Sequence, residues 1–120
     1  MKYTESHEWV EEEGNAIVRI GITAYAQREL GDIVYVELPA IGKQVNAKGE
    51  VAVLESTKAA ADIYSPLSGT IVEVNHNLNS APELINQAPE NEGWIYKLAL
   101  SKQPELDQLM DETRYLSMIS

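Results

Sequence analysis

The feature that most constrains the fold is a succession of short β-prone runs, each closed by glycine or proline before it can lengthen. Runs rich in Val, Ile and Tyr favour strands, and the glycines and prolines between them favour turns. Most of the chain is therefore expected to be strand and turn. The expected strands are residues 16–20, 33–36, 51–54, 63–64, 71–74 and 94–100.

Capping residues predict short helices at a few places. Thr23 is suited to cap a helix over residues 24–30, which Gly31 closes. Ser80 and Glu83 have the spacing of a capping box, which predicts one helical turn running to residue 85. The strands and these helices together form one domain of 120 residues, with a core over about 16–100.

The pattern changes after Pro104, where apolar residues recur at helical spacing. Asp111 is placed to cap a second short helix in this region. The C-terminal helical segment is therefore expected over about 104–119. Its spaced apolar residues are Leu106, Leu109 and Met110, followed by Tyr115, Leu116 and Ile119.

Charge and composition exclude several classes of function. Nine basic against 19 acidic residues give a net charge of −10, which repels nucleic-acid phosphates and anionic membranes. The chain has no Cys, so it has no disulfide, no Cys-ligated metal and no thiol nucleophile. Any redox chemistry must come from a group that is attached or bound. An acidic module that attracts basic partners is one interpretation that remains open.

An internal repeat predicts how the strands are arranged. Residues 31–36 and 69–74, which lie 38 positions apart, share a glycine, an isoleucine and two valines in four of six positions. The repeat predicts two similar β units packed into a small sandwich or flattened barrel, although β-prone strands can also resemble each other by chance. Residues 50–65 between the two units then form a hairpin with an exposed tip.

Lys58 lies at the expected tip of this hairpin. A turn between two β-prone runs projects its side chain outward, and the three alanines that follow leave it open to an enzyme. Glu55 and Asp62 flank it with carboxylates that can orient a partner. These features single out Lys58 as a candidate for modification, and a solvated surface lysine is the alternative.

Intrinsic catalysis is not expected, because no catalytic constellation is complete. His7 and Glu8 begin like a zinc-protease H-E-x-x-H motif, but Glu11 stands where the second histidine ligand is required. No metal site is expected. The sequence also lacks a G-x-S-x-G elbow, a G-x-G-x-x-G fingerprint and a P-loop.

Residues 55–59, Glu-Ser-Thr-Lys-Ala, resemble the lipoyl-attachment motif of swinging-arm carrier domains. A biotin carrier normally has methionines on both sides of the lysine, whereas this chain has Thr57 and Ala59. The whole chain resembles the H-protein family of the glycine cleavage system, and the likeness runs nearly end to end. The matching blocks are 3–4, 6–10, 21–23, 25–27, 30–34, 36–39, 64–69, 72–75, 82–86 and 93–97.

The resemblance implies a mainly β fold, the lipoyl/biotinyl-carrier-like β-sandwich with short additional helices. It also implies that lipoic acid is attached as an amide to Lys58, which changes the net charge from −10 to −11. Lipoylating enzymes are then expected to recognise Glu55, Ser56 and Ala59.

The family's function implies a carrier that catalyses nothing itself. It would shuttle an aminomethyl group from glycine decarboxylase to the tetrahydrofolate-dependent aminomethyltransferase, and its dithiol to dihydrolipoyl dehydrogenase. The alternative within the family is an H-like relay that passes lipoyl or octanoyl groups to 2-oxoacid dehydrogenases. We expect a monomer, because the arm must be exposed. We place it in the cytosol, or in the mitochondrial matrix if a presequence has been removed.

The resemblance also implies a sheltered site for the loaded arm, lined by Ser6, Glu8 and Asp62. On the residues alone, surface polar positions are the favoured interpretation of Ser6 and Glu8, and the resemblance reverses this preference. Trp9 and Trp94 are expected to pack in the core or at its rim.

Departures from the family pattern are modest. Ala61 stands where a serine is common, Glu90 stands where an aromatic is common, and the chain lacks an acidic tail.

Overall fold

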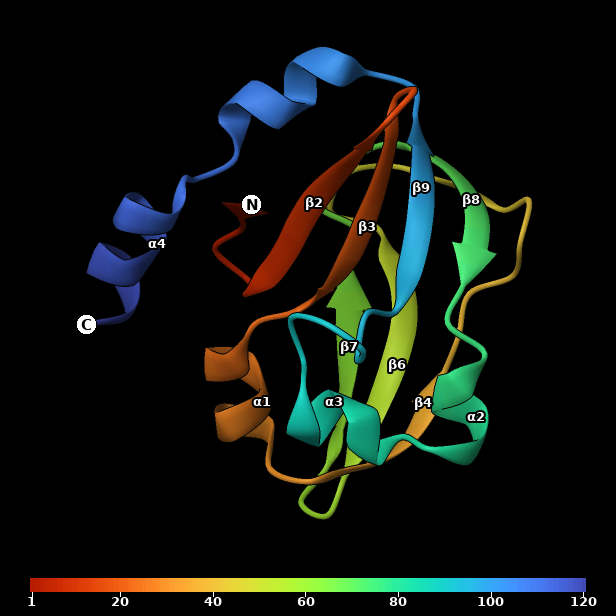
Figure 1. Ribbon diagram of the computed structural model, residues 1–120, viewed down its shortest axis with the longest axis vertical. Helices are drawn as coiled ribbons and strands as arrows, with labels where there is room; N and C mark the ends of the chain where they lie inside the picture. The colour runs from red at the N-terminus through yellow and green to blue at the C-terminus, as the bar shows by residue number, and fades with distance from the viewer.

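The computed structural model describes residues 1–120 and shows two antiparallel sheets packed as a flattened sandwich (Figure 1). The larger sheet contains, in spatial order, β1 (Lys2–Tyr3), β2 (Glu8–Gly14), β3 (Ile17–Ile22), β9 (Tyr96–Leu100), β8 (Gly69–Val74) and β5 (Gln44–Val45). The smaller sheet contains β4 (Ile33–Glu37), β6 (Glu50–Ser56) and β7 (Ala60–Tyr64). This is the fold class expected from the sequence.

Buried apolar residues alternate with outward-facing residues along the strands, and the buried ones form the core between the sheets. In β3, Val18 and Ile20 are fully buried, while Arg19 between them points to the outer face. In β9, Tyr96 and Leu98 are buried on either side of Lys97. Burying each such apolar side chain stabilises the fold by about 1.5–3 kcal/mol. Twenty buried residues from both sheets and the short helices form one continuous core.

The two copies of the internal repeat lie in opposite sheets. Residues 31–36 lead into β4 and residues 69–74 form β8, so each sheet receives one copy. Their glycines serve different purposes. Gly31 has φ 86°, a left-handed conformation that glycine adopts without strain. At Gly69, a Cβ atom would lie only 2.2 Å from the Ala99 carbonyl oxygen, so the glycine lets β8 approach β9.

Two of the predicted helix caps are confirmed. Helix α1 (Ala24–Leu30) begins at Thr23, whose Oγ1 accepts the N–H of Ala26 at 3.2 Å. Helix α4 (Glu112–Ile119) begins at Asp111, whose carboxylate accepts the N–H of Arg114 at 2.8 Å. The Glu90 carboxylate adds a second cap to α1 by accepting the N–H of Ala24 at 2.9 Å.

The capping box predicted at Ser80 is wrong. Ser80 is the last residue of α2 (Asn77–Ser80), and its hydroxyl donates back to the Asn77 carbonyl at 3.5 Å. Helix α3 (Glu83–Gln87) begins after Pro82 without a side-chain cap. The fixed φ of Pro82 already starts the helical turn, so no capping side chain is needed.

The segment after Pro104 is a 3₁₀ helix, η1 (Gln103–Gln108), followed by α4. Leu106 and Leu109 pack against the main core. Met110 exchanges two backbone hydrogen bonds with Tyr3, at 2.8 and 2.9 Å. This pairing attaches the C-terminal segment to the N-terminal strand.

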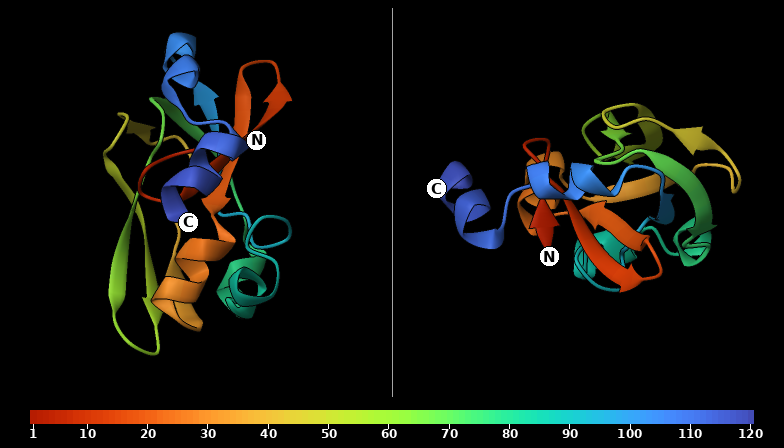
Figure 2. Two further views of the ribbon diagram at one scale, coloured as in Figure 1. Left: turned by 90° about the vertical axis from the view of Figure 1, so that its left-hand side faces the viewer. Right: turned by 90° about the horizontal axis from the view of Figure 1, so that it is seen from above.

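Helix α4 stands out from the sandwich beside the N-terminus (Figure 2). It is held by a small second core of Tyr3, Trp9, Met110 and Tyr115. The rings of Tyr3 and Tyr115 stack with centroids 4.7 Å apart. Trp9 is fully buried in this core, and the partly buried Trp94 packs against it, so the expected packing role of both is confirmed. No helix of the chain combines the length and the apolar character that crossing a membrane requires.

Candidate functional site

The tip of the β6–β7 hairpin lies at the bottom of Figure 1. Lys58 is one of the residues between these two strands, and its side chain is exposed. The side chain of Ser56 shapes this turn. Its Oγ accepts the backbone N–H groups of Lys58 and Ala59 at 3.0 and 3.1 Å and donates to the Ala59 carbonyl at 3.1 Å. A hydroxyl that satisfies three backbone groups fixes a tight turn, so the direction in which Lys58 leaves the hairpin is set.

The hairpin tip is also tied to the end of α1. The N–H of Thr57 donates to the Asp32 carbonyl at 3.0 Å. The Lys58 side chain lies along Gly31, where a Cβ atom would be 3.2 Å from Lys58 Cε. Gly31 therefore leaves a cradle for the lysine stem. This observation fits a long group attached to Lys58 Nζ, because the cradle directs the stem toward α1.

A cavity of about 200 Å³ opens beside this cradle, between β7, α1, the N-terminal loop (residues 4–7) and Glu8 at the start of β2. We call it the smaller cavity. It brings together Ser6, Glu8 and Asp62, the three residues that the sequence nominated as a shelter. Its other lining residues are His7, Ile22, Ala26, Glu29, Leu30, Ala61, Ile63 and Tyr64. Leu30 precedes Gly31, so the lining of the cavity begins one residue from the cradle.

Glu8 is the unusual group in this wall, because a carboxyl group with 2 % exposure must be paired or hydrogen-bonded. Its Oε1 accepts the hydroxyls of Thr4 at 2.6 Å and Ser6 at 2.7 Å. Burial raises the pKa of Glu8, and these hydroxyls together with the Tyr64 backbone N–H oppose the rise. Asp62 is exposed and faces the same cavity. Two carboxyls and a hydroxyl can hold a small cation here.

The comparison with known proteins shows the family of the chain. The family model described as glycine cleavage H-protein matches residues 1–120. The chain belongs to this family. The glycine cleavage system H protein of Xanthobacter autotrophicus is 55% identical over 115 residues, covering 96% of this chain and 91% of the relative. The one from Thermotoga maritima is 54% identical over 114 residues, covering 95% and 91%.

A solved structure shows the same family and fold. The crystal structure of a glycine cleavage system H protein from Mycobacterium marinum superposes with a TM-score of 0.89 at 34% identity. The match covers 98% of this chain and 94% of that one. The family resemblance expected from the sequence is confirmed, and it extends through the C-terminal segment.

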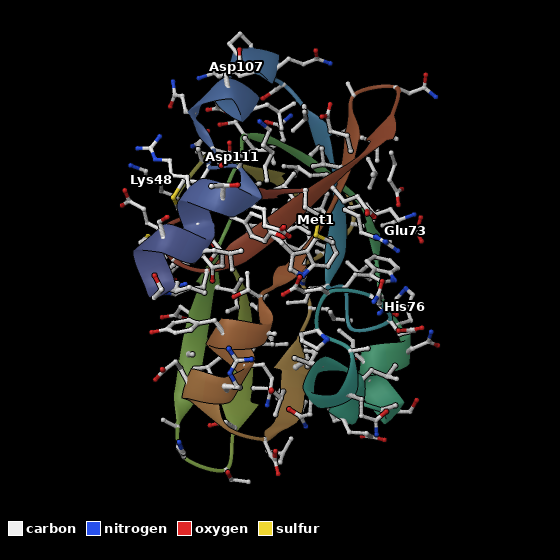
Figure 3. All side chains as sticks on the ribbon, turned by 60° about the vertical axis from the view of Figure 1, so that its left-hand side comes forward. Met1, Lys48, Glu73, His76, Asp107 and Asp111 are labelled. Atoms are coloured by element: carbon white, nitrogen blue, oxygen red, sulfur yellow. The ribbon has the colours of Figure 1, made fainter.

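A larger cavity of about 490 Å³ lies on the other side of the Ser6–Glu8 wall in this family member. Tyr3, Lys48, Glu105 and Arg114 contribute to its lining. Figure 3 shows Lys48 and Asp111 on the side of the molecule where α4 lies. Ser6, Glu8 and Tyr64 border both cavities, so the N-terminal loop separates them.

The sequence did not connect the site to three further residues, of which one lines the smaller cavity and two lie behind it. The His7 ring lines the smaller cavity, and its Nδ1 lies 2.8 Å from the Tyr115 hydroxyl. That hydroxyl lies 2.7 Å from Thr23 Oγ1. The position of His7 between Ser6 and Glu8 was a usable signal. No sequence pattern connects His7 to Tyr115, because 108 residues separate them.

Proposed function

We propose that this chain is the lipoyl-bearing carrier of the glycine cleavage system, with lipoic acid joined as an amide to Lys58, and that it is not itself an enzyme. The observation that supports this most is the path from the exposed Lys58, along the Gly31 cradle, to a cavity with a buried carboxyl group. When bound, the lipoyl group supplies a disulfide that accepts an aminomethyl group on one sulfur and a hydrogen on the other.

The residues of the chain have separate parts in this proposal. The hairpin turn fixed by Ser56 presents Lys58 to enzymes, and the cradle lets the arm fold back. We call the aminomethyl group the cargo. Its cationic amine is held by Ser6, Glu8 and Asp62. The apolar lining of Ile22, Ala26, Leu30 and Ile63 keeps water from the cargo.

The proposed partners follow from the carrier role. They are glycine decarboxylase, the tetrahydrofolate-dependent aminomethyltransferase, dihydrolipoyl dehydrogenase and the enzymes that attach the lipoyl group. For the last of these, we propose that Glu55, Ser56 and Ala59 are the recognised neighbours of Lys58. A tethered arm gives each enzyme a high effective concentration of its substrate. The bacterial relatives support the cytosol as the proposed compartment.

Two measurements test the proposed function. Intact mass and peptide mapping of protein made in a lipoate-competent host are expected to show a lipoyl increment on Lys58. The fully lipoylated protein is then expected to support glycine–bicarbonate exchange with the partner decarboxylase. Lipoylation without exchange would reject the glycine cleavage role and favour a lipoyl or octanoyl relay. If Lys58 stays unmodified while the ligase modifies a control substrate, the carrier function is rejected, and an acidic interaction module is the interpretation that remains.

Ser56→Ala is expected to slow lipoylation of Lys58 about tenfold. The variant loses the hydrogen bonds of Ser56 Oγ to three backbone groups, so the turn no longer fixes the direction of the Lys58 side chain. The rate of lipoyl incorporation by the ligase, followed by mass spectrometry, measures this. Ser117→Ala, a change in α4 away from the hairpin, is the matched control and is expected to incorporate at the normal rate. An unchanged rate for Ser56→Ala would mean that the turn geometry does not govern recognition.

A further inference from the structure

A chain of hydrogen bonds joins the walls of the smaller cavity to the C-terminal helix. The Ala26 N–H in α1 donates to Thr23 Oγ1 at 3.2 Å. Thr23 Oγ1 lies 2.7 Å from the Tyr115 hydroxyl in α4, which lies 2.8 Å from His7 Nδ1 in the N-terminal loop. Thr23 and Tyr115 are 1 % and 3 % exposed, so water cannot replace these partners. The chain links three segments that are distant in sequence.

The direction of this chain can be worked out from its donors and acceptors. If Thr23 donates to Tyr115 and Tyr115 donates to His7 Nδ1, every hydroxyl hydrogen has an acceptor. In the reverse direction, the Thr23 hydroxyl hydrogen is left buried without an acceptor, which costs free energy. The first arrangement is therefore favoured. It requires neutral His7 with an unprotonated Nδ1, so its proton is on Nε2.

The charged and polar surroundings of His7 agree with a neutral ring. Burial lowers the pKa of His7, and Glu29 on α1 opposes this effect. Glu8 follows His7 as the first residue of β2 and lines the same cavity. The Tyr25 ring of α1 packs against the imidazole at 4.7 Å, and Tyr115 contacts it from α4. Glu29 is the acidic group that acts on the ring, Glu8 and Asp62 line the same cavity, and the partly buried imidazole lies between α1 and α4.

His7 also holds the loop that contains Ser6 and leads into Glu8, the first residue of β2. Its backbone has φ 72°, a left-handed conformation that costs a non-glycine residue free energy and needs support from its surroundings. Its N–H donates to the Thr4 carbonyl at 3.1 Å, and its carbonyl accepts the Thr23 N–H at 3.0 Å. The ring contact with Tyr115 adds a side-chain restraint to these backbone bonds. A shift of His7 would move the residues on both sides of it.

We propose that Tyr115 is a positioning residue of the cargo site: its hydroxyl fixes His7, and through His7 the loop that places Ser6 and Glu8, so that helix α4 is part of the shelter. This inference rests on the carrier function proposed above. It assigns a role to the C-terminal segment, which otherwise makes no contact with the smaller cavity. The direct contacts to cargo belong to other residues, and Tyr115 acts on them through His7.

Tyr115→Phe removes the hydroxyl and leaves the rest of the side chain in place. Phenylalanine keeps the ring that stacks on Tyr3, and the Tyr3–Met110 backbone pair holds α4 in place. Tyr25→Phe is a matched control, because it removes the hydroxyl of the other tyrosine that touches the His7 ring, and that hydroxyl makes no hydrogen bond within the chain. Thermal unfolding of both variants shows whether either loses the fold.

The first readout is ¹⁵N NMR of the two histidine rings in the unmodified protein. At a pH where histidines are neutral, His7 in the wild type is expected to carry its proton on Nε2 alone. In Tyr115→Phe its Nδ1 loses the donor, so a mixture of both tautomers is expected, while Tyr25→Phe keeps the wild-type state. His76 is exposed and supplies an internal reference. A single unchanged tautomer in Tyr115→Phe would overturn the proposed chain.

The second readout is the rate at which loaded carrier loses its cargo to water. Tyr115→Phe removes the hydrogen bonds of the hydroxyl with His7 and with Thr23, and loss of the bond that positions the loop is expected to speed the loss of cargo about fivefold. Tyr25→Phe is expected to decay like the wild type. Equal decay of Tyr115→Phe and Tyr25→Phe would overturn the positioning role. Failure of the wild type itself to be lipoylated or loaded would instead reject the carrier function.

A double variant checks that the two residues act together. His7→Asn removes the ring that Tyr115 contacts, and asparagine tolerates the left-handed backbone at this position. If Tyr115 works through His7, adding Tyr115→Phe to His7→Asn is expected to cause no further acceleration. Additive effects of the two changes would show that Tyr115 acts by another route.

Discussion

Lys58→Arg is expected to abolish lipoylation and all carrier activity while leaving the protein as stable as the wild type. A guanidinium stays protonated and has no free amine to form the amide. The side chain is exposed at a hairpin tip, where substitutions change the unfolding free energy by less than about 0.5 kcal/mol. Intact mass, glycine–bicarbonate exchange and thermal unfolding measure the three parts of this result.

Lys43→Arg is the matched control for this experiment. Lys43 is also exposed in a turn, but it precedes β5 on the larger sheet, away from the hairpin. It is expected to retain both the lipoyl increment and the exchange activity. A mass increment on Lys58→Arg would place the attachment site elsewhere. A large fall in its unfolding temperature would show that Lys58 supports the fold.

Features of the fold that depend on residues close together in the sequence were predictable from it. Thr23 and Asp111 cap their helices because each side chain accepts an N–H only three residues ahead. The exposed hairpin around Lys58 follows from two β-prone runs and the small residues between them. The same local argument failed at Ser80, where Pro82 starts the next helix without the serine.

Strand β2 was not predicted, because its outer half is acidic and lacks the composition of a strand. The structure explains it by pairing with β3, where Arg19 forms ion pairs with Glu11 and Glu13. Cross-strand pairs of opposite charge stabilise such a strand, but they depend on register, which composition does not give. The acidic residues 11–13 are therefore part of the sheet.

The candidate site also contains residues that the sequence predicted and one that it did not. The sequence nominated Ser6, Glu8 and Asp62 through the family resemblance, and the structure brings all three to one cavity. It did not nominate Tyr115, whose contact with His7 exists only because α4 returns to the N-terminal strand. Contacts between the two ends of a chain are set by tertiary packing, and one sequence carries no local signal of them.

Glu8→Gln is expected to speed the loss of cargo from loaded carrier by about ten- to a hundredfold, because a charge-assisted hydrogen bond to the cationic amine is worth about 1.5–3 kcal/mol. Glutamine has nearly the same shape, and its amide oxygen can still accept the hydroxyls of Thr4 and Ser6. The change therefore removes the charge and keeps the two hydroxyl bonds, although the amide nitrogen cannot accept the Tyr64 N–H. Release of the one-carbon unit as formaldehyde, followed over time without the partner enzymes, measures the rate.

The same variant is expected to be at least as stable as the wild type at neutral pH. Burial raises the pKa of Glu8, so the folded protein binds this proton more tightly than the unfolded chain does. The stability contributed by the neutral carboxyl is fully present below its ordinary pKa and is lost as the pH rises through the raised pKa. The glutamine amide imitates the neutral carboxyl and stays neutral at every pH, so the variant does not lose this stability. The difference in unfolding free energy between variant and wild type is therefore expected to grow with pH.

Glu12→Gln is the control, because Glu12 is exposed on β2 and forms no ion pair. It removes one negative charge from the same strand and is expected to change neither cargo loss nor the pH dependence of stability. Faster cargo loss in Glu8→Gln together with undiminished stability would show that the buried carboxyl is kept for the cargo rather than for the fold. Equal cargo loss in the two variants would remove Glu8 from the site. A lower stability of Glu8→Gln would mean that its ionised carboxylate supports the N-terminal loop.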